Sequence, residues 1–597
     1  MKLSDYVAEK AVRLGMRHVF SITGGGAMHL NMSLGLNEKL ACVYNHHEQA
    51  CAIAAESYAR LTNKMPLVCV TTGPGGVNAL TGVLGAWVDS IPMFVISGQV
   101  KYATTVRSTG LPLRQLGDQE FDIARAVECM TKYSVMVTDP NEIDYHMERA
   151  FYIATHGRPG PVWLDIPLDV QGAQINAEKL RKYDPKEDAA LNPPKPSDKQ
   201  IAEIIEKIKK AKRPVLLAGT GVRLSGAHEE FLKAVETLNI PVVTAWNAHD
   251  VITEDHPLYF GRPGTVGDRA GNFIVQNSDL LLSVGCRLNI RQISYNWEKF
   301  ARAAYKIVVD IDPVELKKPT VKADMPVHAD CADIFRGIME FTQLPPKSDW
   351  LFWCAERKRR YPVVTDRHRA KTEPVNPYVF MDRLAAALGE NAIVVSTNGS
   401  AVVTGFQAIK IKKGQRLYSN SGCASMGYGL PAALGASVAA GRSVVCLEGD
   451  GSIQMNIQEL QTVASYKIPV KIFIINNSGY HSIRQTQCNF FEGRLAGCTP
   501  ETGVSFPDMG KIAEAYGLPY IRCADHGGLD CAIGSALGTD GPVVCEIVVD
   551  TGQEFEPKLS SKVLRDGRIV SPGLEDMYPF LLRGEFLENM IIKPEED

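Results

Sequence analysis

Two short motifs carry the residues best suited to chemistry. Gly-Asp-Gly-Ser at 449–452 follows an apolar run at 443–447, and Asn-Asn at 476–477 closes an apolar run at 470–475. Short apolar runs bounded by turn residues are typical of buried strands. Because open α/β sheets bind ligands at the carboxyl ends of their strands, we expect both motifs at one edge of a parallel sheet.

The oxygen atoms of these motifs suit a magnesium-bound diphosphate. Mg²⁺ usually combines one or two protein oxygens with phosphate oxygens, and here Asp450 offers a carboxylate and Asn477 a carbonyl. Gly449 and Gly451 let the backbone approach a phosphate, and a helix expected to begin near Ser452 would direct N–H groups at the anion. The alternative is a pair of tight turns without a ligand, which the pairing of the two motifs disfavours.

The elements that must position these motifs recur along the chain. Three segments alternate apolar strands with helices, which predicts an α/β fold of three doubly wound parallel-sheet domains. Helices are expected at 4–14 and 48–61. The expected strands are 18–23, 66–72, 92–98, 161–167, 214–219, 241–246, 280–285, 306–312, 392–397, 443–450, 470–477 and 542–549. The predicted domains are 1–172, 198–345 and 376–550, with linkers at 173–197 and 346–375 and a C-terminal capping tail at 551–597.

Composition narrows the partners. The chain has 597 residues, 64 Lys and Arg against 67 Asp and Glu, and a net charge of -3, so it lacks the charge excess of a nucleic-acid or polybasic membrane binder. Its 14 cysteines include no C-x-x-C pair, which favours a reducing compartment over a disulfide framework. The apolar stretch 79–88 is too short to span a bilayer. We therefore expect a cytoplasmic protein that binds small molecules, with no nucleic acid or membrane partner.

The pair of motifs at 449–452 and 476–477 resembles the metal-diphosphate motif of the thiamine-diphosphate-dependent enzymes. The resemblance extends over nearly the whole chain and is greatest to the acetolactate synthase group, including its relatives that add two-carbon branches to nucleotide-linked deoxysugars. It implies pyrimidine-binding, middle and diphosphate-binding domains in this order, with thiamine diphosphate and Mg²⁺ as cofactors. It also implies a homodimer, or a tetramer, in which Glu48 of one chain serves Asp450 and Asn477 of the other.

The resemblance assigns roles to individual residues. Glu48 would hydrogen-bond the aminopyrimidine ring of the cofactor; the alternative is an acid that merely favours a helix N-terminus. Gln119 would face the reacting centre, or else be an exposed loop amide, and Met426 would support the bend of the cofactor. The implied cofactor-binding residues are Thr72, Gly73, Asn398, Gly399, Ser400, Ala424, Met426, Gly449, Gly451, Ser452, Gly479 and Tyr480. The implied metal ligands are Asp450, Asn477 and Gly479.

Loops in the middle segment resemble those of the FAD-binding members of the family. They lie at strand ends, where glycine loops can wrap a dinucleotide and acids can bind ribose hydroxyls. The implied FAD-binding residues are Gly219, Thr220, Gly221, Arg262, Gly264, Gly285, Arg287, Asp310 and Asp330. No strict G-x-G-x-x-G is present, and other members of the family leave this domain empty or bind another nucleotide there.

Three departures from the acetolactate synthases concern the acceptor side. The loop at 22–25 reads Ile-Thr-Gly-Gly, Asp118 precedes the family glutamine, and Thr486 stands where a tryptophan is usual. We therefore expect a more polar acceptor pocket. A set of polar side chains, His481, Arg484 and Gln485, would either contact a hydroxylated or phosphorylated acceptor or be structural.

The predicted function is a carboligase that decarboxylates a 2-oxo acid, pyruvate above all, and transfers the two-carbon unit to a carbonyl acceptor. A polar or sugar acceptor is one form of this prediction. Two alternatives stay open: a 2-oxo acid decarboxylase or diketone hydrolase of the same family, and a non-catalytic regulatory protein on the same fold. Retention of Glu48, Asp450 and Asn477 argues against the last.

Overall fold

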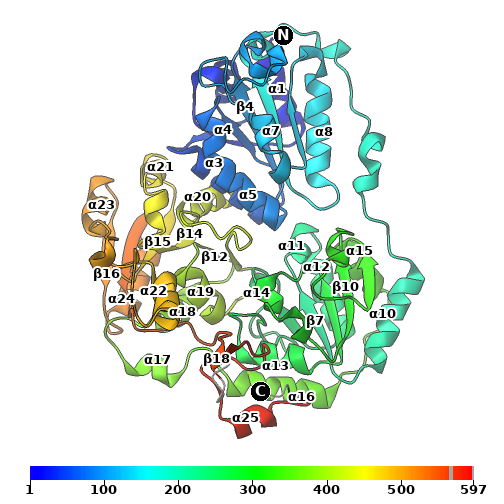
Figure 1. The fold of residues 1–597 in the computed structure, drawn as a ribbon, viewed down its shortest axis with the longest axis vertical. Helices are drawn as coiled ribbons and strands as arrows, with labels where there is room; N and C mark the ends of the chain where they lie inside the picture. Colours follow the sequence, from blue (N-terminus) through cyan, green and yellow to red (C-terminus); the bar gives the residue numbers. More distant parts are fainter. Residues whose placement is uncertain (564–568, 595–597) are drawn as a thin grey trace.

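The computed structural model describes residues 1–563 and 569–594. Three sheets of parallel strands, flanked by helices, form three lobes, which Figure 1 shows in blue to cyan, in green, and in yellow to red. The predicted class, an α/β protein with three parallel-sheet domains, is confirmed. The domain boundaries proposed from the sequence stay predictions.

The first sheet has the strand order β2-β1-β3-β4-β6-β5. Its inner strands are almost entirely buried because helices cover both faces, which is why they read as continuous apolar runs. The strands are β1 His18–Ser21, β2 Ala41–Tyr44, β3 Leu67–Val70, β4 Met93–Gln99, β5 Tyr133–Met136 and β6 Pro161–Pro167. The helices are α1 Leu3–Arg13, α2 Met28–Gly35, α3 Glu48–Thr62, α4 Pro74–Asn78, α5 Leu80–Asp89, α6 Val106–Thr109, α7 Ile123–Ala126, α8 Ile143–Thr155 and α9 Leu168–Gly172.

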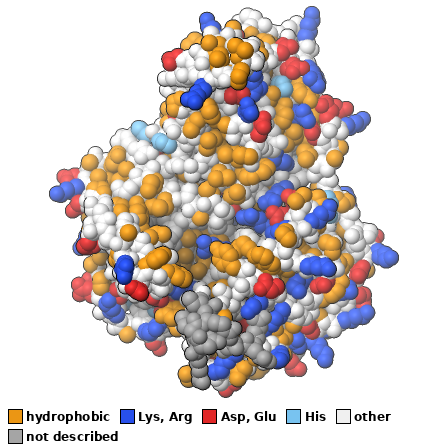
Figure 2. All heavy atoms as spheres, viewed as in Figure 1, with side chains coloured by type: hydrophobic (Ala, Val, Ile, Leu, Met, Phe, Trp, Pro, Cys, Tyr) orange, Lys and Arg blue, Asp and Glu red, His pale blue; other side chains and the backbone are white. Residues whose placement is uncertain are grey.

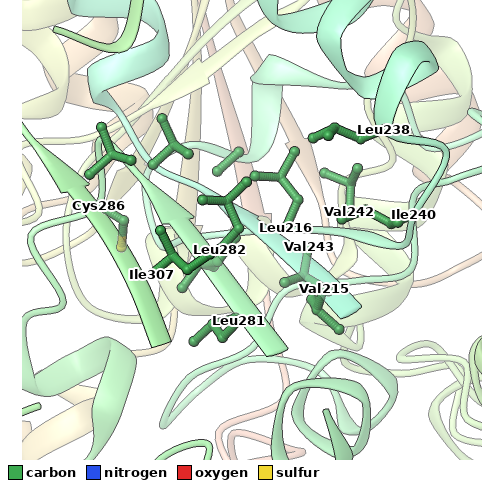
Figure 3. Close-up of a cluster of buried hydrophobic side chains, with 14 of the residues drawn as sticks. Val215, Leu216, Leu238, Ile240, Val242, Val243, Leu281, Leu282, Cys286 and Ile307 are labelled. Atoms are coloured by element: carbon green, nitrogen blue, oxygen red, sulfur yellow. The ribbon is translucent and has the colours of Figure 1, made fainter. Parts of the chain in front are cut away.

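The second sheet has the order β11-β10-β9-β7-β8. Figure 3 shows its core, where side chains such as Leu216, Leu282 and Ile307 from neighbouring strands pack together. The strands are β7 Pro214–Ala218, β8 Val242–Thr244, β9 Leu280–Val284, β10 Tyr305–Asp310 and β11 Met325–His328. The helices are α10 Asp198–Lys210, α11 Gly221–Leu224, α12 His228–Leu238, α13 Arg269–Asn277, α14 Ile290–Ile293 and α15 Cys331–Met339.

The third sheet has the order β13-β12-β14-β15-β17-β16, which repeats the pattern of the first. The strands are β12 Ile393–Ser396, β13 Arg416–Tyr418, β14 Val444–Gly449, β15 Val470–Asn476, β16 Tyr520–Cys523 and β17 Val543–Val548. The helices are α18 Pro377–Ala387, α19 Ser400–Ala408, α20 Gly429–Ala440, α21 Glu459–Ser465, α22 His481–Phe490, α23 Met509–Ala515 and α24 Leu529–Gly538. The adjacent strands β14 and β15 pair in register from Val444 and Val470 onward, so their ends coincide.

Helices α3 and α20 join the first and third domains through one hydrophobic cluster. They approach so closely that a Cβ at Gly435 would lie 2.0 Å from the backbone oxygen of Ala54. Only glycine fits at this crossing. In Figure 1 the two helices lie between the upper lobe and the lower left lobe.

The connecting segments are partly helical. The segment 346–375 contains α16 (Ser348–Arg360) and α17 (Asp366–Ala370), and the tail contains α25 (Arg583–Glu588) and the short antiparallel pair β18 (Lys562–Val563) and β19 (Ile569–Val570). Basic and acidic side chains are interspersed over the face that Figure 2 shows, as the small net charge leads one to expect. Within the described ranges, no helix is long and apolar enough to cross a membrane. The cytoplasmic location stays a prediction.

Candidate active site

Asp450 and Asn477 lie together where β14 and β15 end. One oxygen of the Asp450 carboxylate accepts hydrogen bonds from the backbone N–H groups of Asn477, at 3.1 Å, and Gly479, at 3.2 Å. The other accepts from the N–H of Gly451 at 2.9 Å. Burial raises the pKa of Asp450 to about 6, although these N–H donors favour its ionised form. The three N–H groups thus fix the orientation of the carboxylate, but they do not fully compensate for the loss of water around its charge.

The side-chain carbonyl of Asn477 is unused. Its oxygen is buried and has no hydrogen-bond partner among the described residues, while its nitrogen donates to the Ser400 hydroxyl at 3.3 Å. A buried acceptor without a partner requires an explanation, and a hard cation beside Asp450 supplies one. In the part of the chain that the structure describes, no three His, Cys, Asp or Glu residues gather around a metal position, so a cation here would take further oxygens from its ligand.

Gly479 completes this turn. Its φ of +144° lies in a region that L side chains rarely adopt, and a Cβ there would meet the backbone oxygen of Cys498 at 2.1 Å. The guanidinium of Arg484 donates to the backbone oxygens of Asn477 and Ser478, at 3.2 and 3.0 Å. Arg484 therefore has a structural role in the turn, which the sequence left open.

These residues form one end of a cavity of about 850 Å³, called here the Asp450 cavity. The helix α19 begins in it at Ser400, so its free N–H groups can meet an anion. Met426, 37% exposed, also lines it. Of the cofactor-binding residues predicted for the third domain, the cavity wall contains Asn398, Gly399, Ser400, Ala424, Met426, Gly449, Gly451, Ser452, Gly479 and Tyr480.

One expectation about this cavity is wrong. No α-helix begins near Ser452: a 3-10 turn at Ile453–Met455 stands there, and α21 starts only at Glu459. The reason is Asn456, whose φ of -141° breaks the helix. Its side-chain nitrogen instead donates to the backbone oxygen of Gly427 and to Gln49 of the first domain, both at 2.8 Å. The helix N-terminus that faces the cavity belongs to α19.

Gly451 is needed for a reason that the sequence did not suggest. A Cβ at this position would meet the Tyr480 ring at 2.5 Å. The hydroxyl of Ser452 accepts from the N–H of Gly427 at 2.9 Å and lies 2.6 Å from the Thr397 hydroxyl. Both residues thus pack the floor of the cavity.

The first-domain residues gather at the corresponding edge of their own sheet. The Glu48 carboxylate, at the start of α3, accepts from the Asn78 amide at 3.1 Å. Gly73, with a φ of +57°, lies under the loop of Gln119, because a Cβ there would meet the Gln119 backbone oxygen at 2.1 Å. Thr72 donates its hydroxyl proton to the Gly98 oxygen at 3.1 Å. None of these residues lines the Asp450 cavity of the same chain, although Gln49, the residue after Glu48, accepts a hydrogen bond from Asn456 of the third domain.

A second cavity, of about 270 Å³, lies where the three domains meet; we call it the junction cavity. Of the predicted FAD-binding residues, it is lined by Gly219, Thr220, Gly221, Gly285, Arg287, Asp310 and Asp330. Arg158 of the first domain and Gly422 of the third complete the wall. Burial raises the pKa of Asp310 to about 6. The set of glycine loops, acids and arginines has the chemistry of a nucleotide site.

Arg262 and Gly264, the other two predicted FAD-binding residues, lie outside the junction cavity. The buried Arg262 guanidinium donates to the backbone oxygens of Phe406 and Ile409 and so ties the second domain to α19. The N–H of Gly264 donates to the Asn272 side chain at 2.9 Å. Glycine loops after strands look alike in a sequence, whether they bind a nucleotide or a neighbouring domain.

Sequence reasoning missed several residues of the Asp450 cavity. Arg291 and Tyr295 come from the second domain, and Lys558, Ser560 and Ser571 come from the tail. They carry no local motif, and only the arrangement of domains brings them here. His481 and Gln485 do line the cavity, but His481 contacts the backbone oxygen of Gln553 at 2.9 Å and Gln485 contacts His481 at 2.6 Å.

Comparison with known families matches three separate regions of the chain. Residues 1–125 match the thiamine pyrophosphate enzyme N-terminal TPP binding domain, residues 201–338 the central domain, and residues 397–547 the C-terminal TPP binding domain. The chain belongs to the thiamine pyrophosphate enzyme family. The resemblance expected from the GDG and NN motifs is therefore confirmed.

Within this family the chain is related to acetolactate synthases. It is 33% identical over 553 residues to the acetolactate synthase large subunit of Corynebacterium glutamicum, which covers 91% of this chain and 86% of that protein. It is 32% identical over 568 residues to the large subunit of Pyropia yezoensis, with 92% of each chain covered. A probable large subunit of Methanocaldococcus jannaschii is 32% identical over 574 residues, with 93% of each covered.

Proposed function

We propose that the protein is a thiamine-diphosphate- and Mg²⁺-dependent carboligase that decarboxylates a 2-oxo acid such as pyruvate and transfers the two-carbon unit to a carbonyl acceptor. The observation that carries the proposal is the unpartnered, buried Asn477 carbonyl beside the Asp450 carboxylate. In a chain with N- and C-terminal TPP binding domains, this donor pair fits the cation of a metal diphosphate.

The residues of the Asp450 cavity suit that ligand. Asp450, Asn477 and the backbone oxygen of Gly479 would hold the cation, and the N-terminus of α19 at Ser400 would receive the diphosphate. When bound, thiamine diphosphate supplies a carbanion that attacks the 2-oxo acid and an electron sink for the loss of carbon dioxide. Met426 offers an apolar support for the cofactor in the cavity wall.

The role proposed for Glu48 requires a second chain. Its carboxylate would accept a hydrogen bond from the aminopyrimidine ring and so hold a proton where the cofactor needs it. Glu48, Thr72 and Gln119 do not line the Asp450 cavity of their own chain. A homodimer, alone or paired into a tetramer, would bring the first-domain edge of one subunit to the Asp450 cavity of its partner.

We also propose that the junction cavity binds FAD. Asp310 and Asp330 would take ribose hydroxyls, and Arg287 would meet the diphosphate beside the Gly219–Gly221 loop. A yellow protein with the visible absorption of oxidised flavin would support this assignment. A colourless protein that also fails to take up added FAD would reject it.

We propose in addition a polar acceptor, which hydroxyl and amide groups in the wall of the Asp450 cavity support. Besides Thr486, the wall includes Ser482, Asn489, Ser560, Ser561 and Ser571, which lie among apolar side chains such as Ile483 and Phe490. These groups offer hydrogen-bond partners that a hydroxylated acceptor would use and an alkyl group would leave unpaired. A hydroxylated or sugar-like carbonyl compound is the acceptor class that we propose.

The deciding experiment is a product screen. The purified protein is incubated with thiamine diphosphate, Mg²⁺ and pyruvate, alone and with a panel of aldehydes, 2-oxo acids and keto-sugar nucleotides, and the products are identified by mass spectrometry. Acetolactate or a two-carbon adduct of an acceptor supports the carboligase. Acetaldehyde without a coupled product identifies a decarboxylase instead, and cleavage of a diketone without coupling identifies a hydrolase.

Glu48→Ala is the matched variant for this screen. It should abolish most carbon dioxide release from 2-oxo acids, whereas Asn78→Ala, which removes only the hydrogen-bond partner of Glu48, should retain it. A wild-type protein that releases no carbon dioxide from any 2-oxo acid and cleaves no diketone would overturn the enzyme assignment and favour a regulatory protein on this fold.

A further inference from the structure

The Asp450 cavity and the junction cavity share a wall. The four-residue helix α14 forms part of it: Ile290 and Arg291 line the Asp450 cavity, while Gln292 lines the junction cavity. Successive residues of a helix face different sides, so a single turn is enough to separate two sites. A change on one side of α14 can therefore reach the other directly.

Trp246 is also part of this wall and holds its elements together by contacts with α14 and α19. The indole is buried and lines the junction cavity, and its ring centroid lies 5.3 Å from the guanidinium carbon of Arg291. This distance is within the range of a cation–π interaction. The backbone N–H of Trp246 donates to the Gln292 side chain at 3.0 Å, and its ring lies 4.9 Å from that of Phe406 in α19. Trp246 thus contacts both α14 and the helix that begins in the Asp450 cavity.

Arg291 is a cation that this wall presents to the Asp450 cavity. Across residues 1–563 and 569–594, no carboxylate forms an ion pair with it, and the ionisable group beside it is Tyr295. The other cation in the wall, Lys558, lies 3.4 Å from the Glu554 carboxylate. His249, whose ring centroid lies 5.8 Å from that of Trp246, does not compete for the indole, because burial lowers the pKa of its imidazole well below the usual range. Arg291 is therefore available to an anionic group in the cavity.

The segment next to Trp246 is tied to the third domain. The Asn247 amide donates to the backbone oxygen of Ser419 at 2.7 Å and accepts from its N–H at 3.0 Å. Ser421 and Gly422, two and three residues further, line the junction cavity, whereas Ala424 and Met426 line the Asp450 cavity. The two cavities are thus in contact through this loop as well.

We propose that Trp246 is a positioning residue for the carbonyl acceptor, an inference that rests on the proposed carboligase function. Its ring holds the Arg291 guanidinium where an acceptor with a carboxylate or phosphate group can meet it. A nucleotide in the junction cavity touches Trp246 and Gln292, restricts both, and so tightens the binding of an anionic acceptor. By linkage, the acceptor must tighten nucleotide binding by the same factor.

The kinetic test compares an anionic with a neutral acceptor. Trp246→Leu removes the aromatic ring, and Trp246→Phe keeps a smaller one. Trp353→Leu is the control, because the Trp353 ring also has an arginine over it, with the guanidinium carbon of Arg357 4.0 Å from the ring centroid, but lines neither cavity. With saturating pyruvate as donor, Trp246→Leu should raise the KM for 2-oxobutyrate about fivefold and leave the KM for propanal and both kcat values nearly unchanged. Trp246→Phe should be intermediate. An equal rise for both acceptors, or no rise, would overturn the proposal.

The binding test does not depend on turnover. In protein stripped of thiamine diphosphate, flavin fluorescence gives the Kd of FAD with and without pyruvate, and calorimetry gives the Kd of pyruvate with and without FAD. We expect each ligand to lower the Kd of the other about fivefold in the wild type and in Trp353→Leu, and not in Trp246→Leu. FAD that does not bind, or that binds without this effect, rejects the coupling. Weaker pyruvate binding in Trp246→Leu by a protein with no carboligase activity would support Trp246 and reject the proposed reaction.

Discussion

Asp450 and Asn477 lie side by side in the cavity but differ in how their oxygen atoms are hydrogen-bonded. The Asp450 oxygens are already engaged by three backbone N–H groups, so the carboxylate is oriented before any ligand arrives. The Asn477 carbonyl oxygen is left without a partner, which costs the protein without ligand stability. A preformed cation site has this form, because the carbonyl oxygen gains its interaction only when the cation binds.

The first prediction follows from that cost. Asn477→Leu removes the unpartnered carbonyl together with a weak 3.3 Å bond to Ser400, so the protein without ligands should be as stable as the wild type or more stable by up to about 2 kcal/mol. The rise in Tm that Mg²⁺ and thiamine diphosphate produce should disappear. Thermal unfolding with and without both ligands measures the two effects.

Asn398→Leu is the control for this prediction. The Asn398 amide nitrogen donates to the Asn420 side chain at 2.9 Å and to the Ser425 backbone oxygen at 2.8 Å. Its loss should destabilise the protein without ligands by about 1–3 kcal/mol. If Asn477→Leu destabilises the protein without ligands as much as Asn398→Leu does, and if Mg²⁺ and thiamine diphosphate still raise its Tm, Asn477 is structural and the proposed cation site is wrong.

At the scale of elements, the strands that the sequence did not reveal have a common property. The inner strands, such as β4 and β15, are buried on both faces and form continuous apolar runs. Apart from the short pair β18 and β19 in the tail, the described strands absent from the expectations are β2, β5, β11, β13 and β16, and all five lie at the edges of the parallel sheets. Four of them, β2, β5, β11 and β16, are mostly part-exposed, so their apolar positions are few and interrupted, and β13 has only three residues.

The same reasoning explains how much of the site was predictable. The GDG and NN motifs lie at the ends of inner strands, so their approach in space followed from the strand pattern alone. Arg291 comes from the four-residue helix α14 and Lys558 from an irregular tail segment. Neither element has a period that a sequence could display. Their place in the cavity depends on how the domains pack, which no local pattern encodes.

The tail is anchored by an element-scale contact that is sensitive to pH. The Glu556 carboxylate contacts the His368 imidazole at 2.6 Å and pairs with Arg367 of α17. Burial would raise the pKa of Glu556, but hydrogen bonds from His368, Arg367 and Gln553 outweigh it and lower this pKa to about 2. A carboxyl group with a lowered pKa stabilises the folded protein above its unfolded pKa and loses that effect as the pH falls through its folded pKa.

The second prediction is therefore that Glu556→Gln lowers stability at neutral pH but not in acid. Because Arg367 is largely exposed and solvent screens the pair, we expect a loss of about 1 kcal/mol. The difference in Tm between wild type and variant should be constant above a pH of about 4.5 and shrink toward pH 2. Calorimetric scans across this range measure it. A difference that does not shrink in acid would show that the carboxylate charge is not the cause.

At the scale of the whole molecule, buried ion pairs hold the three domains together. Arg416 of β13 donates to the Asp250 carboxylate of the second domain at 2.7 Å and to the Leu61 backbone oxygen of the first at 3.2 Å. Burial would raise the pKa of Asp250, but Arg416 and Arg223 outweigh this effect and lower it. The carboxylate thus stays charged inside the junction between domains.

The third prediction is that Arg416→Met severely destabilises the protein, by about 3–5 kcal/mol, because it leaves the buried Asp250 charge with Arg223 alone. Combining it with Asp250→Asn should recover part of this loss, since the buried carboxylate charge is then removed, although Arg223 loses its ion-pair partner. Denaturant unfolding of both single variants and the double variant measures the coupling. Strictly additive losses would show that the pair does not stabilise the junction.

The two halves of the proposed site belong to the first and third domains. Glu48 lies at the edge of the first sheet, and the Asp450 cavity, which contains no first-domain residue, lies at the edge of the third. If catalysis needs both, we expect a dimer in which Glu48 of each subunit meets the Asp450 cavity of the other. A symmetric dimer then contains two such shared sites. A site shared in this way makes a distinctive prediction about mixtures of inactive chains.

The fourth prediction is that Glu48→Gln and Asp450→Asn complement each other. A heterodimer of the two variants has one site with both residues native and one site with neither. With random pairing about half of the dimers are mixed, so co-expressed chains should recover about a quarter of wild-type activity while each variant alone is inactive. The control, Asp450→Asn with Asn477→Leu, should recover nothing, because both changes lie in the same half of the site. If the first pair also recovers nothing in dimers shown by mass spectrometry to be mixed, each chain uses its own Glu48.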